Sequence, residues 1–116
     1  IRDRLDFWSA TCPPCIDALP GLKELYEDNR DKGLVLLGIT ADENIDTVKS
    51  IVKKFKIPYT VLLDPGGKTF EKYQVESIPR VVVVGRNGRI LADFTGYSRA
   101  QHETIVETVE QLLKSE

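Results

Sequence analysis

Apolar residues along this chain follow two alternating patterns, which predict strands and helices in turn. Continuous apolar runs at 34–40 and 81–84 are typical of strands buried on both faces of a sheet. Apolar residues spaced three or four apart predict amphipathic helices at 44–55 and 98–113. The other expected strands are 5–8, 59–63 and 90–97, and the other expected helices are 12–32 and 69–73.

Residues that favour helix ends mark the boundaries of these elements. Pro13 and Pro14 fit the first turn of a helix, where a missing N–H removes no hydrogen bond, and Gly33 fits the C-terminal stop of that helix. Asp42 or Asn44 is expected to cap the helix at 44–55.

The pair Asn87-Gly88 predicts a hairpin turn, so the strands on either side of it are expected to be antiparallel. The element order is then β-α-β-α-β-α-β-β-α, which predicts an α/β fold with one mixed sheet between helices. We expect a single domain over residues 1–116, whose first strand has lost part of its natural beginning.

The composition is that of an ordinary folded domain. A chain of 116 residues, 41% of them hydrophobic, can build a core without cross-links, so its two cysteines are expected to serve chemistry. The net charge is −2, with acidic and basic residues interspersed. This balance argues against nucleic acid or anionic lipid as a partner and favours another protein or a small thiol.

Both cysteines lie in the segment Cys12-Pro13-Pro14-Cys15, where the first strand is expected to meet the first helix. Two thiols at this spacing can close a small disulfide. The N–H groups and the dipole at a helix N-terminus stabilise a thiolate on the first of them. Because a thiolate is the nucleophile of disulfide exchange, the segment predicts a redox site.

A zinc site and an unreactive staple are the alternatives for this pair. Zinc takes three or four protein ligands, and beyond the cysteines the chain offers a lone histidine, His102, which we expect on the surface. A bridge between near neighbours constrains the unfolded chain less than a long loop does. We therefore expect no metal, and no cofactor beyond a redox-active disulfide.

Three features together resemble the thioredoxin superfamily: Asp6-Phe7-Trp8 ahead of a Cys-x-Pro-Cys, Ile78-Pro79 before a hairpin, and the order of elements. The likeness covers nearly the whole chain. The inserted unit made of the helix at 44–55 and the strand at 59–63 resembles that of the TlpA/ResA group of bacterial thiol-disulfide oxidoreductases. Peroxiredoxins carry a similar insertion, but this sequence lacks their Pro-x-x-x-Thr-x-x-Cys signature.

The resemblance implies roles for the matching residues. Cys12 would be the exposed nucleophile and Cys15 the buried resolving thiol. Asp6 would be a buried carboxylate that helps to deprotonate Cys15, and the alternative is a strand-end charge that reaches solvent. Pro79 would be a cis-proline facing the cysteines, which leaves the backbone of Ile78 to bind an extended substrate. The supporting residues would be Trp8, Pro13 and Pro14.

Two positions depart from the usual pattern of the group. Thr11 stands where an aromatic residue is usual before the first cysteine, and Ala18 stands where many members have a glutamate. Asp6 is then the carboxylate left to relay a proton.

We expect a thiol-disulfide oxidoreductase that acts on protein disulfides or dithiols, receives electrons from a protein or a small thiol, and is a monomer. Pro13 and Pro14 remove two N–H donors that could otherwise stabilise a Cys12 thiolate. A less stabilised thiolate favours a reductase over a strong oxidase. The alternatives are a thiol peroxidase and a non-catalytic thioredoxin-like binding module.

The resemblance also implies an extracytoplasmic location in the bacterial periplasm or cell envelope, with cytochrome c biogenesis among the roles it admits. A cytoplasmic location is the alternative. The apolar runs are shorter than the roughly 20 residues that span a bilayer. Because the chain has no methionine and no leader, we expect that a targeting or tethering segment has been removed.

Overall fold

In the computed structural model, which describes residues 2–85 and 88–114, one mixed sheet has the strand order β3-β2-β1-β4-β5. β1 pairs parallel with β2 and antiparallel with β4, so the strand that leads to the cysteines lies at the centre of the sheet. The strands are β1 (Arg2–Trp8), β2 (Leu34–Thr40), β3 (Thr60–Leu63), β4 (Arg80–Val84) and β5 (Ile90–Thr95). β4 and β5 form the predicted antiparallel pair, and the turn residue Asn87 lies outside the described residues.

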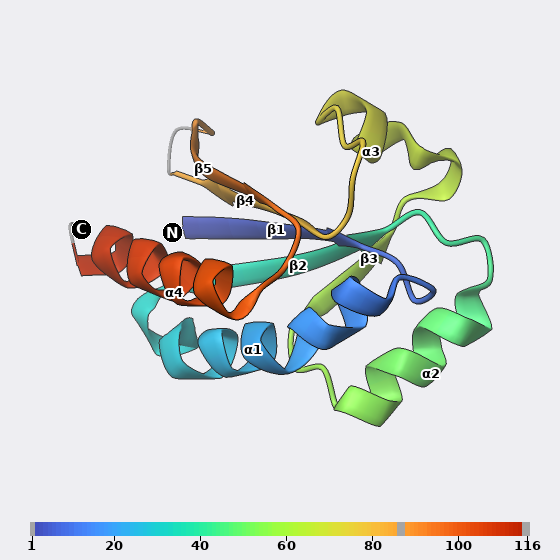
Figure 1. Cartoon of the computed structure of the whole chain (residues 1–116), viewed down its shortest axis with the longest axis horizontal. Helices are drawn as coiled ribbons and strands as arrows, with labels where there is room; N and C mark the ends of the chain where they lie inside the picture. Colours follow the sequence, from blue (N-terminus) through green and yellow to red (C-terminus); the bar gives the residue numbers. More distant parts are fainter. Residues whose placement is uncertain (1, 86–87, 115–116) are drawn as a thin grey trace.

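Helices cover both faces of this sheet. Figure 1 shows α1, α2 and α4 on one side and α3 on the other. The helices are α1 (Pro13–Asn29), α2 (Ile45–Phe55), α3 (Lys68–Lys72) and α4 (Arg99–Lys114), with short 3-10 turns at Arg30–Lys32 and Pro65–Gly67. This layering confirms the predicted α/β fold. Along the described part of the chain, no helix combines the length and the apolar character needed to cross a bilayer.

The first helix begins as its sequence predicts, but its α-helical part ends three residues before the expected end at residue 32. Cys12 is the N-cap residue in an extended conformation, and both prolines lie in the first turn. The α-helix ends at Asn29, and a 3-10 turn carries the chain to Gly33, whose φ of 94° is left-handed. The buried side of α1 faces the sheet through Cys15, Ala18, Leu19, Leu22 and Leu25.

Side chains of β1 alternate between the two faces of the sheet. Leu5 and Phe7 belong to a cluster with aromatic residues of α3, whereas Trp8 packs with Cys15 in a cluster on the face covered by α1 and α2. The same alternation places Asp6 on the face of Trp8. The strand therefore brings a carboxylate to the side of the sheet on which the cysteines lie.

The expectation of a surface position for His102 is wrong. Its imidazole is half-buried against Gly21 of α1, where an added Cβ would come within 2.6 Å of the ring, and it lies 6.0 Å from the ring of Tyr97. The sequence around His102 could not predict this burial, because the contact is with Gly21 on a helix far away in the chain.

Candidate active site

The two cysteines form a disulfide across the first turn of α1. Cys12 is partly exposed, whereas Cys15 is completely buried, at 0% exposure. The backbone N–H of Cys15 donates to Sγ of Cys12 over 3.4 Å. An attacking thiol can therefore reach the sulfur of Cys12 but not that of Cys15.

The loop before β4 brings a distant segment to this disulfide. The Ile78–Pro79 peptide bond is cis, as predicted, and the carbonyl oxygen of Ile78 lies 3.9 Å from Sγ of Cys12. Pro79 is buried, and its carbonyl accepts a hydrogen bond of 2.8 Å from the backbone N–H of Gly96. The exposed sulfur and the residue before the proline thus lie side by side.

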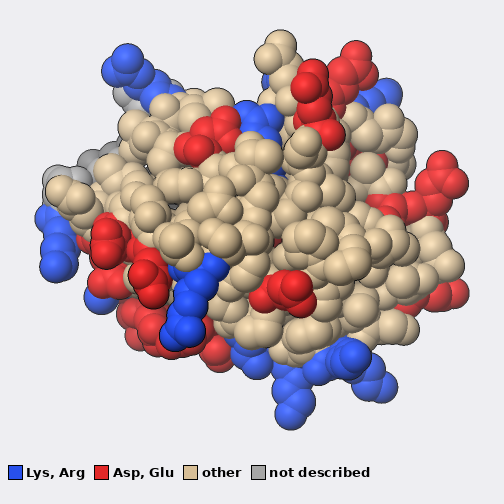
Figure 2. Space-filling model, viewed as in Figure 1, with Lys and Arg blue, Asp and Glu red and all other residues tan. Residues whose placement is uncertain are grey.

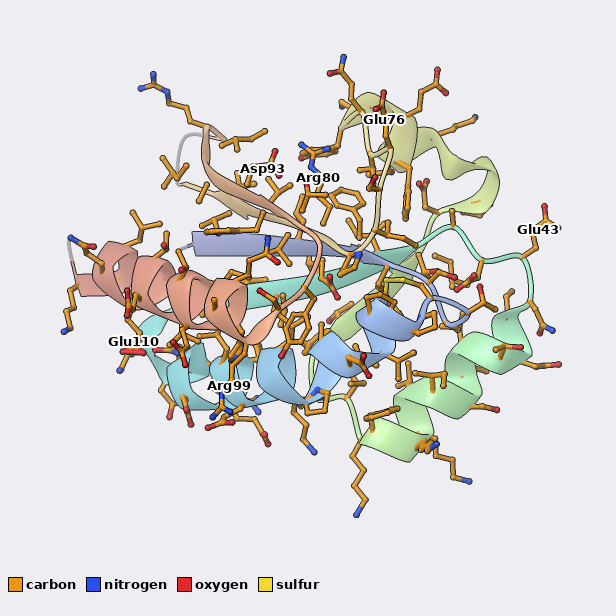
Figure 3. All side chains as sticks on the ribbon, viewed as in Figure 1. Glu43, Glu76, Arg80, Asp93, Arg99 and Glu110 are labelled. Carbon is orange, nitrogen blue, oxygen red and sulfur yellow. A yellow bond between two sulfur atoms is a disulfide. The ribbon has the colours of Figure 1, made fainter. Side chains whose placement is uncertain are left out.

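Arg80 anchors the chain immediately after this proline. Its Nε and Nη2 donate to the two carboxylate oxygens of Asp93 over 2.9 and 2.6 Å, and its Nη1 donates to the carbonyl of Tyr73. Figure 3 shows Arg80 and Asp93 side by side near β5. The hydrogen bond from Arg80 lowers the pKa of Asp93, with burial opposing it, and the pKa of Arg80 is raised. Charge-assisted bonds therefore tie the proline loop to β5 and to the end of α3.

Asp6 and Trp8 are buried on the face of the sheet that α1 covers. Asp6 is only 1% exposed, so the alternative in which its carboxylate reaches solvent is wrong. Trp8 is also 1% exposed and packs in the cluster that contains Cys15. Both predicted residues therefore share the α1 face of the sheet, and a role for Asp6 in proton transfer stays a prediction.

The two departures from the family pattern have clear structural settings. Thr11 is exposed immediately before Cys12, the N-cap of α1, and its hydroxyl lies 3.0 Å from that of Ser9. Ala18 is buried among Leu22, Leu36 and Tyr59, so a carboxylate at this position would enter an apolar cluster. Within residues 2–85 and 88–114, no group of three or more His, Cys, Asp and Glu residues is arranged to hold a metal ion.

Asp42 belongs to the surroundings of the site, although its sequence suggests only a helix cap. Its carboxylate accepts hydrogen bonds from the hydroxyl of Ser9 (2.6 Å), the backbone N–H of Ala10 (2.8 Å) and the hydroxyl of Thr40 (2.7 Å). Burial raises the pKa of Asp42, but these hydrogen bonds outweigh it and hold that pKa below its usual value. Asn44 is the cap of α2 instead, accepting from the backbone N–H of Thr47.

The predicted topology could have indicated that Asp42 lies near the cysteines. The carboxyl ends of neighbouring parallel strands meet at one edge of a sheet, and β1 and β2 pair with Trp8 opposite Thr40. A polar residue just after β2 is therefore expected beside the loop that follows β1.

The sequence matches a family model and is similar to known proteins. Residues 4–113 match the family model described as Redoxin. Thiol-disulfide oxidoreductase ResA from Bacillus thuringiensis subsp. konkukian (strain 97-27) is 30% identical over 110 residues, covering 95% of this chain and 60% of that protein. ResA from Halalkalibacterium halodurans is 27% identical over 97% of this chain and 62% of its own. This chain spans about three fifths of the length of these relatives.

Solved structures agree with this likeness. A Chlorobium tepidum protein described as a thiol:disulfide interchange protein DsbE has a TM-score of 0.92 and 25% identity, over 97% of this chain and 79% of its own. StoA from Bacillus subtilis has a TM-score of 0.79 and 24% identity, over 91% of this chain and 80% of its own. These likenesses confirm the predicted thioredoxin-like fold.

Proposed function

The chain belongs to the Redoxin family, and on that premise we propose that it is a thiol-disulfide oxidoreductase that exchanges disulfides with protein partners through Cys12 and Cys15. The observation that carries the proposal is the bridge between a partly exposed Cys12 and a buried Cys15 at a helix N-terminus, beside Ile78. Similarity to ResA, a named thiol-disulfide oxidoreductase, and the predicted resemblance to the TlpA/ResA group support it.

Reduction of a partner proceeds in two displacements. The Cys12 thiolate attacks one sulfur of the partner disulfide, and the other partner sulfur leaves as a thiolate and takes up a proton. A mixed disulfide now joins Cys12 to the partner. Cys15 loses its proton and attacks Sγ of Cys12, which releases the second partner thiolate and closes the Cys12–Cys15 bridge. The partner gains two electrons, and a donor dithiol, or two small thiols in turn, reopens the bridge by two displacements in reverse and is oxidised to a disulfide.

Residues around the cysteines supply binding and proton transfer. The exposed Cys12 meets the partner, and the backbone of Ile78 beside it is available to an extended substrate segment. Asp6, buried on the α1 face, is the group that we assign to removal of the Cys15 proton during the second displacement. Trp8, packed with Cys15, holds the buried thiol in place.

We assign the direction of exchange as partner reduction. Pro13 and Pro14, in the first turn of α1, have no backbone N–H with which to stabilise a Cys12 thiolate. A weakly stabilised thiolate disfavours the reduced protein and makes it a better reductant. Equilibration with glutathione tests this. The expected potential lies nearer that of thioredoxin, about −270 mV, than that of DsbA, about −120 mV, and a value near the latter contradicts the direction.

The partners that fit this site are protein disulfides, with a protein dithiol or a small thiol as electron donor. Acidic and basic side chains are interspersed over the face shown in Figure 2, which suits varied protein partners better than a polyanion. We propose a monomer. We propose an extracytoplasmic location because partner disulfides persist in oxidising compartments. Labelling of the cysteine thiols of this protein in intact cells by a membrane-impermeant thiol reagent tests the location.

Turnover of insulin tests the function. We expect the protein to accelerate insulin reduction by dithiothreitol, and Cys12→Ser to abolish the acceleration. A bridge that dithiothreitol cannot reduce would indicate a binding module instead. Peroxide consumption far faster than that of free cysteine, without insulin turnover, would indicate a thiol peroxidase.

A further inference from the structure

The loop that carries Cys12 is attached to the end of β2 through one carboxylate. Oδ1 of Asp42 accepts from the hydroxyl of Ser9 over 2.6 Å, and Oδ2 accepts from the N–H of Ala10 over 2.8 Å. Oδ2 also accepts from the hydroxyl of Thr40 over 2.7 Å, and that hydroxyl in turn lies 3.2 Å from the N–H of Asp42. The carboxylate of Asp42 therefore binds Thr40 at the end of β2 and, in the loop after β1, the hydroxyl of Ser9 and the N–H of Ala10.

Ser9 transmits this attachment to Cys12. Its backbone carbonyl accepts from the N–H of Cys12 over 3.2 Å, and its hydroxyl oxygen accepts from the N–H of Thr11 at the same distance. The carboxylate of Asp42 is thus connected, through Ser9, to the backbone of the residue that caps α1. That cap position brings Sγ of Cys12 within 3.4 Å of the N–H of Cys15 and within 3.9 Å of the carbonyl oxygen of Ile78.

Asp42 is not the N-cap of α2, although its position in the sequence suggests that role. Asn44 accepts the N–H of Thr47 and caps α2, so the carboxylate of Asp42 is not the side-chain cap of that helix. The hydrogen bonds from Ser9, Ala10 and Thr40 outweigh partial burial and lower the pKa of Asp42, which keeps the group ionised at neutral pH.

We propose that Asp42 is a positioning residue for thiol-disulfide exchange, which holds the Ser9–Thr11 loop so that Sγ of Cys12 stays at the helix N-terminus beside Ile78. This inference rests on the proposed exchange at Cys12. Displacement reactions require the attacking and leaving sulfurs to be aligned, and small misplacements of a reacting group slow such steps strongly. Asp42 acts through Ser9 and Ala10 and does not touch the reacting sulfurs.

Two substitutions separate the geometry of Asp42 from its charge. In Asp42→Asn, the amide oxygen can accept from Ala10 and Thr40, and the amide nitrogen can donate to the hydroxyl oxygen of Ser9, so the three contacts are retained without charge. In Asp42→Ala, both the contacts and the charge are lost. A positioning role predicts that the two variants differ, whereas a purely electrostatic role predicts that they are equally affected.

The experiment measures the rate constant for reduction of the oxidised full chain by dithiothreitol at pH 7, with thiols alkylated and counted by mass. We expect Asp42→Ala to lower this rate constant about ten-fold. The rate constant of Asp42→Asn should be at least a few-fold higher than that of Asp42→Ala. Insulin turnover should follow the same order.

Asp64→Ala is the matched control for a loss of stability. The carboxylate of Asp64 also accepts backbone N–H groups, those of Thr69 and Phe70, at 3.0 Å, and it also has a lowered pKa because its hydrogen bonds outweigh burial. Its contacts lie in α3 and not in the loop before Cys12. We expect Asp64→Ala to unfold at lower urea concentration while it keeps the parent rate constant.

Four results are decisive. If Asp42→Ala is reduced as fast as the parent, or if both Asp42 variants are equally slow, the positioning role is overturned while the proposed function stands. If Asp64→Ala is slowed as much as Asp42→Ala, loss of stability explains the effect and the role is again overturned. If dithiothreitol does not reduce the parent, the proposed function itself fails, and the inference about Asp42 fails with it.

Discussion

Two buried groups, Cys15 and Asp6, carry the second displacement in the proposed mechanism. Cys15 is inaccessible to solvent, so its proton needs an acceptor inside the protein. Asp6, which lies on the same face of β1 as Trp8, provides a carboxylate there. We propose that proton transfer from Cys15 to Asp6 governs release of the partner.

Substituting Asp6→Asn tests this transfer with little change of shape. The asparagine cannot accept the Cys15 proton as a carboxylate does, so decay of the mixed disulfide at pH 7 should slow at least about ten-fold, while its formation changes little. Rapid mixing with a small chromogenic disulfide measures both steps. Asp17→Asn, which alters an exposed acid of α1, serves as the control. Equal rates of decay in Asp6→Asn and the parent contradict the assignment.

Trp8 offers an optical signal of the redox state. It is the only tryptophan of the chain, and it packs in the cluster that contains Cys15. A disulfide quenches a neighbouring indole more strongly than a thiol pair does, so emission should rise when dithiothreitol opens the bridge. The Cys12→Ser variant, which has no bridge, should show no such rise. Emission of the parent that is unaffected by reduction contradicts the close packing of Trp8 and Cys15.

Residues whose role depends on local pattern were predictable from the sequence, and those whose role depends on tertiary contact were not. The spacing of Cys12 and Cys15 predicts their bridge directly. Asp42 and Asn44 are equally good helix caps by residue type, and only the meeting of β1 with β2 directs Asp42 to the loop at Ser9. The partial burial of His102 likewise follows from Gly21 on another helix.

Whole elements were predicted well because each has its own start and stop signals. Gly33 ends the first helical segment in a left-handed conformation, and Asn44 begins α2, as their residue types indicate. The short α3 has weaker signals, since its stabilising carboxylate comes from Asp64, before the Pro65–Gly67 turn. Its first residue is Lys68, one residue before the predicted start.

The contribution of the α2 cap to stability can be measured by substituting Asn44. Asn44→Ala removes the acceptor for the N–H of Thr47, so the free energy of unfolding should fall by about 1 kcal/mol. Urea denaturation followed by circular dichroism measures it. Asn44→Asp keeps an acceptor at the same position and should recover most of the loss. Equal stability of the alanine variant and the parent contradicts the capping role.

Three aspartates link the stability of the whole molecule to pH. Asp42, Asp64 and Asp93 each have a pKa below the usual value in the folded protein, because their hydrogen bonds outweigh burial, which acts in the opposite direction for all three. A carboxyl group with a lowered folded-state pKa binds protons more tightly when unfolded. Its contribution is therefore complete above the unfolded-state pKa of about 3.9, and it is lost as pH falls through the lower folded-state value.

We accordingly expect the free energy of unfolding to decrease as pH falls below about 4. Urea titrations between pH 7 and pH 2.5 measure this decrease. Asp64→Asn should show a shallower dependence because one of the three linked groups is absent, whereas Glu43→Gln, at an exposed position, should follow the parent. A stability that does not change over this range contradicts the hydrogen-bonding roles of the three carboxylates.

In the proposed mechanism Cys12 meets the partner and Cys15 releases it, so trapping of the mixed disulfide distinguishes the two cysteines. Reduced Cys15→Ser and Cys12→Ser variants are each mixed with a disulfide-bonded protein and examined by mass spectrometry without reductant. Cys15→Ser should form a long-lived one-to-one adduct through Cys12 that dithiothreitol dissolves, and Cys12→Ser should form none. Equal adduct formation by the two variants, or an adduct through Cys15, would contradict these roles of the two cysteines.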